Sequence, residues 1–283
     1  MAAIANGAMR AGHLRANGIR IHYLDYAGDG QHKSPILIVP GITSPAVTWA
    51  FAAEKLAGSH RVVVVDLRGR GLSESRPGLG YGLDDYVADI SDVIIALELR
   101  KPILLGHALG GRIGIRLAGS WPNVLSKLIL VDPPLAGPGR RPYEGALDYY
   151  LNLIEQASRG ATLADFRKLY PKWSDEQIAL RLQWLPSCSI EAVTASHHNF
   201  HSEDIFGDIP HIMCETLLLR AAKAKVVTAE DEAEILALNP RLRAASVDAG
   251  HMVPWENLPD FLAAVRAFIE DDHAIPGIAR IQS

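Results

Sequence analysis

Lys101-Pro-Ile-Leu-Leu-Gly-His-Ala-Leu-Gly-Gly-Arg112 is the most informative stretch of this 283-residue chain. The apolar run at 103–105 predicts a short buried strand, and the residues from Gly110 onward predict a helix. Between them, Gly106 and Gly110 stand two positions either side of Ala108, which leaves room for a tight and strained turn. This is the outline of a nucleophile elbow, G-x-S-x-G, with alanine in place of serine.

A nucleophile elbow lifts its central side chain above the edge of a sheet. The backbone N–H of the next residue, here Leu109, then points at the oxygen that becomes negative during attack. The methyl group of Ala108 cannot attack a carbonyl carbon. The surrounding sequence therefore predicts a hydrolase, whereas the chain as given lacks the nucleophile.

The composition is that of a globular protein with a sizeable core, at 48% hydrophobic and 21% charged residues. The net charge is −4, without a basic stripe or a block of like charge, which argues against a nucleic-acid partner. No apolar run approaches the roughly 20 residues of a membrane span. We expect a small-molecule partner and no membrane partner, while the oligomeric state stays open.

Cysteine usage and the amino-terminal sequence both favour a cytoplasmic protein. Cys188 and Cys214 are too few for a disulfide framework, and neither has a second cysteine at metal-ligand spacing. We therefore expect reduced thiols and no metal site. Residues 1–12 lack the apolar segment of a signal peptide.

Strand and helix patterns alternate along most of the chain. An Asn17-Gly18 turn between alternating apolar residues predicts a hairpin. Core strands are expected at 35–39, 61–66, 103–105, 125–131, 216–219 and 243–247, with helices at 83–97, after Gly110, and from 228 and 259. This alternation predicts an α/β fold with a mostly parallel, doubly wound sheet.

The middle of the chain carries no strand pattern. Capping boxes at Thr162 and Ser174 indicate helices, and aromatic residues are frequent there. Because strand patterns resume afterwards, we interpret residues 135–206 as a helical cap inserted into a core of residues 1–134 and 207–283. An independent helical domain is the alternative interpretation.

Residues suited to catalysis follow four of the predicted strands. They are Ile42, Ala108, Asp132 and His251. The carboxyl ends of parallel strands meet at one edge, where open α/β sheets place their sites. His251 can act as the general base, and Asp132 can orient its imidazole. The backbone N–H groups of Ile42 and Leu109 would form the oxyanion hole.

The position of the acid is unusual. The more frequent arrangement places it after the strand that follows a cap, but no Asp or Glu stands there before Glu230. Asp132 lies one strand earlier, directly before the cap, and still keeps the order nucleophile, acid, base. Each motif alone is weak, because a glycine-rich turn or a late histidine is often structural. A dinucleotide site at Gly110 is disfavoured, because the G-x-G-x-x-G spacing is absent.

Six stretches resemble a known family, and they span most of the chain. They are Val39-Pro-Gly-Ile-Thr-Ser-Pro-Ala-Val-Thr-Trp49, Asp66-Leu-Arg-Gly-Arg-Gly-Leu-Ser73, Gly106-His-Ala-Leu-Gly-Gly111, Val131-Asp-Pro-Pro-Leu-Ala-Gly-Pro-Gly-Arg-Arg-Pro-Tyr143, Trp173-Ser-Asp-Glu-Gln177 and Ala249-Gly-His-Met-Val-Pro-Trp255. In them the chain resembles the N-formylmaleamate deformylases, which have the α/β-hydrolase fold and act in aerobic nicotinate breakdown. The resemblance implies hydrolysis of an N-formyl amide to formate and maleamate, without a metal or organic cofactor. It also implies a Ser-Asp-His triad, whose roles fall on position 108, Asp132 and His251.

Ala108 departs from this family, which has serine at the same position. One interpretation is a deliberate replacement, of the kind made to trap a substrate, and the other is a natural pseudoenzyme. A strained elbow costs roughly 1–3 kcal/mol, and a drifting scaffold should relax it. Since the rest of the constellation looks intact, we favour replacement and expect this chain to be inactive.

A small dicarboxylate-like substrate requires cationic and hydrogen-bonding groups. The candidates are Thr43, Ser44, Arg140, Arg141, Tyr143, Arg167 and Trp184. The arginines supply cations from the cap, the hydroxyl residues stand beside the oxyanion loop, and the aromatic residues would wall the pocket. His107, beside the elbow, is expected to be a packing residue.

Three other functions stay open at this point. A sibling with the same triad would hydrolyse another N-acyl amide from pyridine-ring breakdown. A cofactor-independent, ring-cleaving dioxygenase would use the His–Asp pair as a base and would need a roomy, apolar pocket. A non-catalytic binding module would keep Ala108 as its native residue and sense a ligand.

Overall fold

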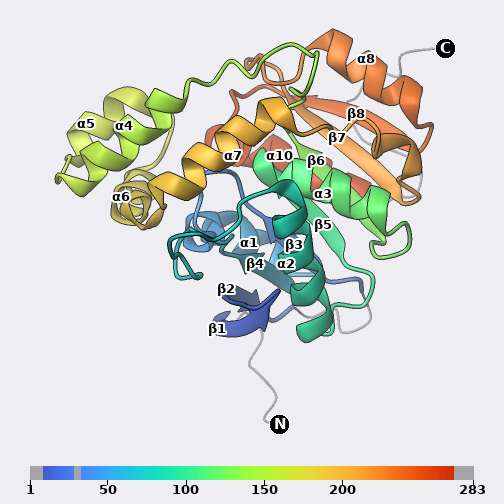
Figure 1. The fold of residues 1–283 in the computed structure, drawn as a ribbon, viewed down its shortest axis with the longest axis horizontal. Helices are drawn as coiled ribbons and strands as arrows, with labels where there is room; N and C mark the ends of the chain where they lie inside the picture. Colours follow the sequence, from blue (N-terminus) through green and yellow to red (C-terminus); the bar gives the residue numbers. More distant parts are fainter. Residues whose placement is uncertain (1–8, 29–32, 271–283) are drawn as a thin grey trace.

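The computed structural model describes residues 9–28 and 33–270. One eight-stranded sheet forms its centre, in the order β1-β2-β4-β3-β5-β6-β7-β8 (Figure 1). The strands are β1 (Met9–Ala16), β2 (Ile19–Tyr26), β3 (Ile36–Val39), β4 (Val62–Val65), β5 (Ile103–His107), β6 (Lys127–Val131), β7 (Glu215–Ala221) and β8 (Leu242–Val247). β2 pairs antiparallel with β1 and β4, and the pairs from β4 to β8 are parallel. The predicted mostly parallel sheet is confirmed.

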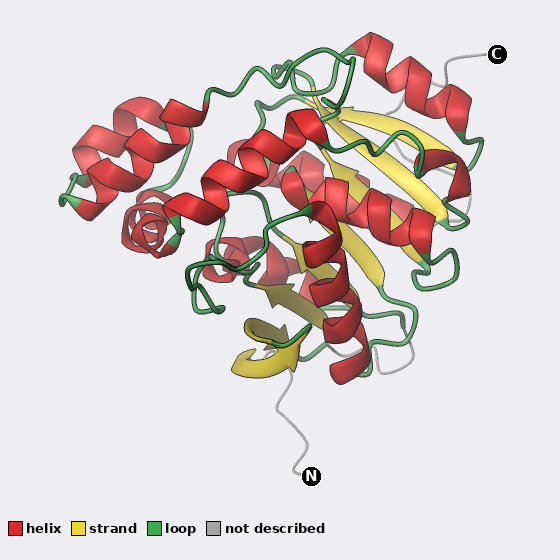
Figure 2. Cartoon of the chain, in the orientation of Figure 1, coloured by secondary structure: helices red, strands yellow, loops and turns green. Residues whose placement is uncertain are grey.

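The central strands are apolar because helices cover both of their faces. All four residues of β3 and all four of β4 are buried, which is typical of a parallel sheet between two helical layers. The core helices are α1 (Ala50–Ala57), α2 (Leu83–Ala96), α3 (Leu109–Ser120), α8 (Ala229–Leu238), α9 (Val253–Glu256) and α10 (Leu258–Glu270). Figures 1 and 2 show α2 and α3 on one face and α1 and α10 on the other. The helices that the sequence predicted are present as α2, α3, α8 and α10, and β1 and β2 form the predicted hairpin.

Four α-helices lie between β6 and β7. They are α4 (Leu147–Ser158), α5 (Leu163–Leu169), α6 (Asp175–Trp184) and α7 (Ile190–Ser202). Both predicted capping boxes form, at Thr162 and Ser174. In Figure 1, α4, α5 and α6 make a lobe beside the sheet, and α7 runs back over the core. We keep the name cap for residues 135–206.

Two buried arginines of the core hold α7 in place. Arg70 donates through Nη2 to the carbonyl oxygen of Ala192 (3.1 Å) and to Ser196 Oγ (2.9 Å). Arg112, on α3, donates to the carbonyl oxygen of Glu203 at 2.7 Å, just after α7 ends. Burial lowers the pKa of Arg112 to about 10, and its carbonyl acceptors offset part of the cost of desolvation.

None of the helices in the described part of the chain is both long and apolar enough to cross a bilayer.

Candidate active site

The turn between β5 and α3 has a strained backbone. Ala108 has φ 49° and ψ −113°, a conformation that residues with a side chain rarely adopt. The hydrogen bond from Ala108 N to the carbonyl oxygen of Val131 (3.0 Å) and that from Gly111 N to the carbonyl oxygen of Ala108 (3.0 Å) hold it. This is the elbow that the glycine spacing predicted.

Glycines around the elbow are required by close backbone approach. A Cβ on Gly106 would lie 2.2 Å from the carbonyl oxygen of Gly110, and a Cβ on Gly110 would lie 1.9 Å from that of Val39. A Cβ on Gly41 would lie 3.3 Å from the Cβ of Ala108. The loop after β3 therefore passes directly beside the elbow, as an oxyanion-hole loop must.

A histidine and a carboxylate meet beside this loop. His251 Nδ1 lies 2.7 Å from Asp132 Oδ2, and the backbone N–H of Ala221 donates to Asp132 Oδ1 at 3.2 Å. Asp132 is fully buried at the end of β6, whereas His251 follows β8 and is partly exposed. The carboxylate fixes the imidazole through Nδ1, which leaves Nε2 for a reacting group.

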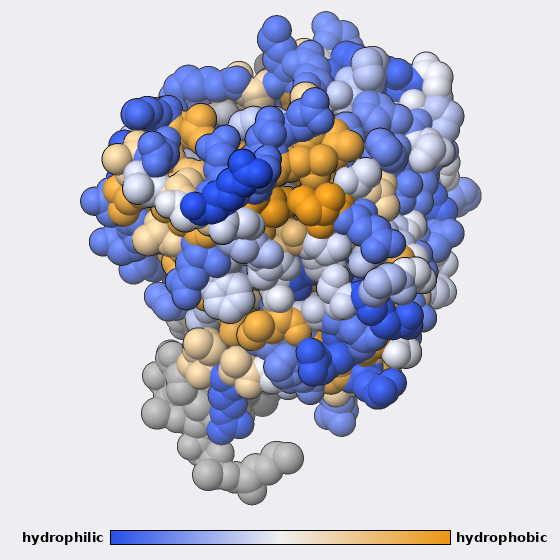
Figure 3. Space-filling view, turned by 60° about the vertical axis from the view of Figure 1, so that its left-hand side comes forward, coloured by the Kyte–Doolittle hydropathy of each residue, from blue (hydrophilic) through white to orange (hydrophobic). Residues whose placement is uncertain are grey.

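A cavity of about 390 Å³ opens at the carboxyl ends of the strands, within the range of small-molecule sites. Its lining residues are Gly41, Ile42, Thr43, Ser44, His107, Ala108, Tyr143, Glu144, Gly145, Tyr149, Tyr150, Leu169, Tyr170, Arg181, Val226, His251, Met252 and Glu256. In Figure 3, with the cap side turned forward, hydrophobic side chains form patches among hydrophilic ones. Tyr149 and Leu169 are exposed apolar residues of the cap and also line the cavity.

The structure brings most of the predicted core residues together. Ala108, His251 and Ile42 line the cavity, and the carboxylate of Asp132 is hydrogen-bonded to His251. Leu109 is the first residue of α3, so its backbone N–H has no acceptor within the helix. Of the substrate-binding candidates, Thr43, Ser44 and Tyr143 also line the cavity.

Four predicted substrate-binding residues lie elsewhere. Arg140 pairs with Glu234, Arg141 with Asp231 (2.8 Å) and Arg167 with Asp175, and Trp184 lies at the end of α6. None of the four is among the residues that line the cavity. The physical reason is that each arginine already has an acidic partner outside the cavity, which its position in the sequence does not reveal.

The arginine that does line the cavity, Arg181, was not among the predicted residues. Arg181, on α6, is 5% exposed and lies one helical turn from Ile178, on the buried face of that helix. The sequence gives little signal for this position, because α6 has only a weak apolar face. Tyr150 was also missed, and its hydroxyl oxygen lies 2.5 Å from that of the predicted Tyr143.

His107 lies against the imidazole of His251. The carbonyl oxygen of His251 lies 2.9 Å from His107 Nε2, so that nitrogen carries the proton and donates. The two rings lie 5.0 Å apart, centroid to centroid. Burial first, and the neighbouring His251 second, lower the pKa of His107 to about 3, so it stays neutral. Burial also raises the pKa of Tyr143 well above its ordinary value.

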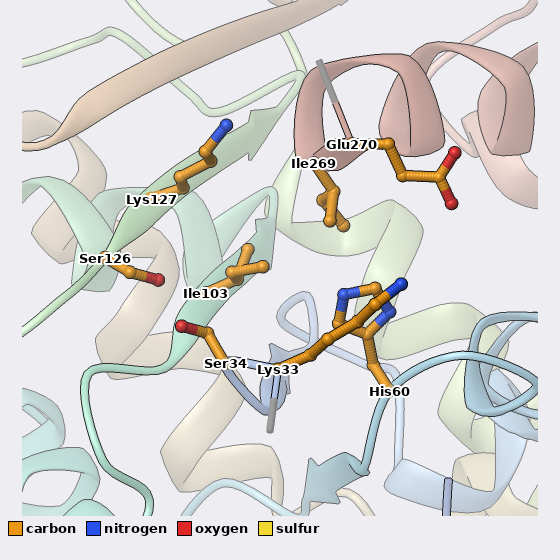
Figure 4. Close-up of a pocket in the computed structure, with 8 residues that line it drawn as sticks. All are labelled: Lys33, Ser34, His60, Ile103, Ser126, Lys127, Ile269 and Glu270. Carbon is orange, nitrogen blue, oxygen red and sulfur yellow. The ribbon is translucent and has the colours of Figure 1, made fainter. Parts of the chain in front are cut away.

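A second hollow lies at the opposite, amino-terminal ends of the strands. Figure 4 shows its eight lining residues: Lys33, Ser34, His60, Ile103, Ser126, Lys127, Ile269 and Glu270. Burial lowers the pKa of His60, and the charge of Lys33 adds to this effect. The hollow contains neither the elbow nor the His251–Asp132 pair, so we assign the reaction to the cavity at the carboxyl ends. In the part of the chain that the structure describes, no three His, Cys, Asp or Glu side chains are grouped to hold a metal ion.

Comparisons with known proteins agree with this geometry. A profile described as "Alpha/beta hydrolase family" matches residues 36–265. N-formylmaleamate deformylase of Pseudomonas putida is 45% identical over 92% of this chain and 96% of its own length, which confirms the resemblance found in the sequence. The crystal structure of the N-formylmaleamic acid deformylase Nfo from Pseudomonas putida S16, a variant with a serine replaced by alanine, is 46% identical with a TM-score of 0.85. That match covers 90% of this chain and 99% of the other. E-2-(acetamidomethylene)succinate hydrolase shares the fold, with a TM-score of 0.76 at 23% identity over 93% of this chain and 100% of its own.

Proposed function

The chain belongs to the α/β-hydrolase family, and from this premise we propose a serine-type amide hydrolase that acts on N-formylmaleamate. The reaction would release formate and leave maleamate. One observation carries the proposal: the His251–Asp132 hydrogen bond stands beside a strained elbow. The 45% identity to an N-formylmaleamate deformylase supports the choice of substrate.

With serine at position 108, His251 takes the hydroxyl proton while the oxygen attacks the formyl carbon. The backbone N–H groups of Ile42 and Leu109 stabilise the negative oxygen of the tetrahedral intermediate. Asp132 holds the imidazole and stabilises its cation. His251 then gives the proton to the amide nitrogen, the C–N bond breaks, and maleamate leaves.

A formyl ester of the serine remains after this first half of the reaction. His251 deprotonates a water molecule, which attacks the ester carbon and restores the serine hydroxyl, so formate leaves. This mechanism uses no metal and no organic cofactor. We propose that the reaction takes place in the cytoplasm as a step of aerobic nicotinate breakdown, and the two free cysteines agree with a reducing compartment.

In the present chain, Ala108 supplies no nucleophile, so we expect substrate binding without turnover. The elbow keeps its positive φ of 49° and the His251–Asp132 pair is retained. A scaffold that no longer catalyses has no use for a strain of roughly 1–3 kcal/mol. We therefore infer that alanine replaces a serine nucleophile in an otherwise complete site.

The first experiment is formate release from N-formylmaleamate by Ala108→Ser, with the Ala108 chain measured beside it. Turnover with serine alone is the expected result. Absence of turnover in both would remove the substrate assignment, and another N-acyl amide of a small acid would be tested next. Turnover by the Ala108 chain would overturn the nucleophilic mechanism, because His251 would then be acting on water.

The other functions make different predictions for the same two chains. A ring-cleaving dioxygenase is poorly supported, because the buried Arg181 and the carboxylates of Glu144 and Glu256 line the cavity. Oxygen uptake with hydroxyquinolines would reveal it. A non-catalytic binding module is supported only by Ala108 itself, and tight ligand binding with no turnover after Ala108→Ser would favour it.

A further inference from the structure

Arg181 is a cation of the cap that reaches the core through a buried contact. Its Nη2 donates to Thr43 Oγ1 at 2.9 Å, and its Nη1 donates to the carbonyl oxygen of Thr43. Its Nε is buried and has no hydrogen-bond partner. Arg181 is 5% exposed and lines the cavity that also holds Ala108 and His251.

The charge of Arg181 has no acidic partner within ion-pair distance in the described part of the chain. The two carboxylates of the cavity are engaged elsewhere. Glu256 accepts from the backbone N–H of Gly250 at 2.9 Å and lies 3.5 Å from Lys172 Nζ. Glu144 lies 3.8 Å from Arg141. Because a buried charge without a counter-charge is costly, an anion in the cavity would stabilise Arg181.

Hydroxyl groups stand in the same cavity as this cation. The hydroxyls of Tyr143 and Tyr150 are paired at 2.5 Å, and those of Tyr149 and Tyr170 at 3.3 Å. In each pair one hydroxyl donates to the other, so the accepting hydroxyl keeps its own O–H for a ligand. All four tyrosines line the cavity, which therefore offers two neutral donors together with one cation.

We propose that Arg181 and the tyrosine hydroxyls bind the carboxylate of the substrate. The proposal rests on the proposed function and adds the specificity of the site. Thr43, which Arg181 contacts, directly follows Ile42 of the oxyanion loop. Arg181 would therefore bind the carboxylate next to the place where the oxyanion loop binds the scissile carbonyl. The substrate class is short N-formyl amides with a carboxylate, and neutral N-formyl amides are excluded.

A purely structural role for Arg181 is the competing explanation, because the contact with Thr43 joins cap and core. The two roles differ in how they treat ligand charge. A structural role weakens charged and neutral ligands equally when Arg181 is replaced. A carboxylate site weakens only the charged ligand, so the ratio of the two affinities is the decisive quantity.

The test uses the Ala108 chain as it is and calorimetric titration with maleamate and with maleamide, its neutral diamide counterpart. We expect the parent chain to bind maleamate at least about tenfold more tightly, and Arg181→Gln to lose that preference. Arg181→Lys keeps the charge and should retain a preference of smaller size. Arg167→Gln is the matched control, since this cap arginine pairs with Asp175 outside the cavity, and it should bind both ligands as the parent does.

Equal affinity of the parent chain for the two ligands would overturn the proposal without any substitution, even if Arg181→Gln failed to fold. A folded Arg181→Gln chain that kept the preference for maleamate would overturn it as well. Failure of the proposed function is separate. If Ala108→Ser released no formate while the preference depended on Arg181, the carboxylate site would stand and the deformylase assignment would fall.

Discussion

The core side and the cap side of the cavity are built in different ways. On the core side, Ala108, Asp132 and His251 are held at strand ends by backbone geometry and by the partly buried hydrogen bond between His251 and Asp132. On the cap side, Arg181 and the tyrosines reach the cavity from helices and are held by side-chain contacts. Together with the two proposals above, this difference predicts that the core supplies the chemistry and the cap supplies recognition. Substitutions on the core side should act on kcat, and those on the cap side on KM.

The largest effect is expected at the His251–Asp132 pair. In an Ala108→Ser background, His251→Ala or Asp132→Ala should each lower kcat at least about a hundredfold, because the serine loses its base or the base loses its orientation. Initial rates of formate release over a range of N-formylmaleamate concentrations measure this. If His251→Ala turned over nearly as fast as the Ala108→Ser chain without it, the core side would not be the chemical side.

A smaller effect on the core side concerns acid stability. The folded state keeps His107 neutral with a pKa of about 3, whereas the unfolded chain takes up this proton near pH 6.5. Stability from this group is thus present above pH 6.5 and is lost as the pH falls. Below about pH 6 the free energy of unfolding of the parent chain should fall by up to about 1.4 kcal/mol per pH unit more than that of His107→Gln. Urea unfolding at pH 7, 6, 5 and 4 measures this. The prediction is contradicted if the free energies of unfolding of the two chains decrease equally as the pH falls.

The smallest effect is expected on the cap side, at the arginines that are already paired. Arg140→Gln, Arg141→Gln and Arg167→Gln should each change KM by no more than about twofold, because each of these side chains is paired most closely with a carboxylate that does not line the cavity. Steady-state kinetics in the Ala108→Ser background provide the measurement. A KM raised tenfold in any of the three would move the carboxylate site away from Arg181.

The core side could be predicted from sequence because local patterns fix it. Gly106 and Gly110 have to be small for the backbone to turn, and Asp132 and His251 follow apolar runs that make strands of the same sheet. The order of these strand ends along the chain then implies that the residues share one edge of the sheet.

The cap side could not be predicted in the same way. The acidic partners of Arg140 and Arg141 are Glu234 and Asp231 on α8, about 90 residues away. The sequence around the two arginines does not indicate these pairings. The orientation of α6 toward Thr43 depends on tertiary packing, so Arg181 looked like one charged residue among many. The Ala-rich helix α1 was missed because short alanine runs carry little periodic signal.

The anchoring of α7 by Arg70 and Arg112 has a mechanical consequence. Because these core arginines donate into and just beyond α7, that helix should open and exchange its amide protons together with the core. In the described part of the chain, the polar side-chain bridge from α6 to the core is the Arg181–Thr43 contact. The lobe of α4, α5 and α6 also contacts the core elsewhere, because Lys172 Nζ lies 3.5 Å from Glu256 and the ring of Trp173 stacks on that of Trp255. A ligand bound at Arg181 would add a contact between this lobe and the core, so it should slow amide exchange in the lobe more than in α7.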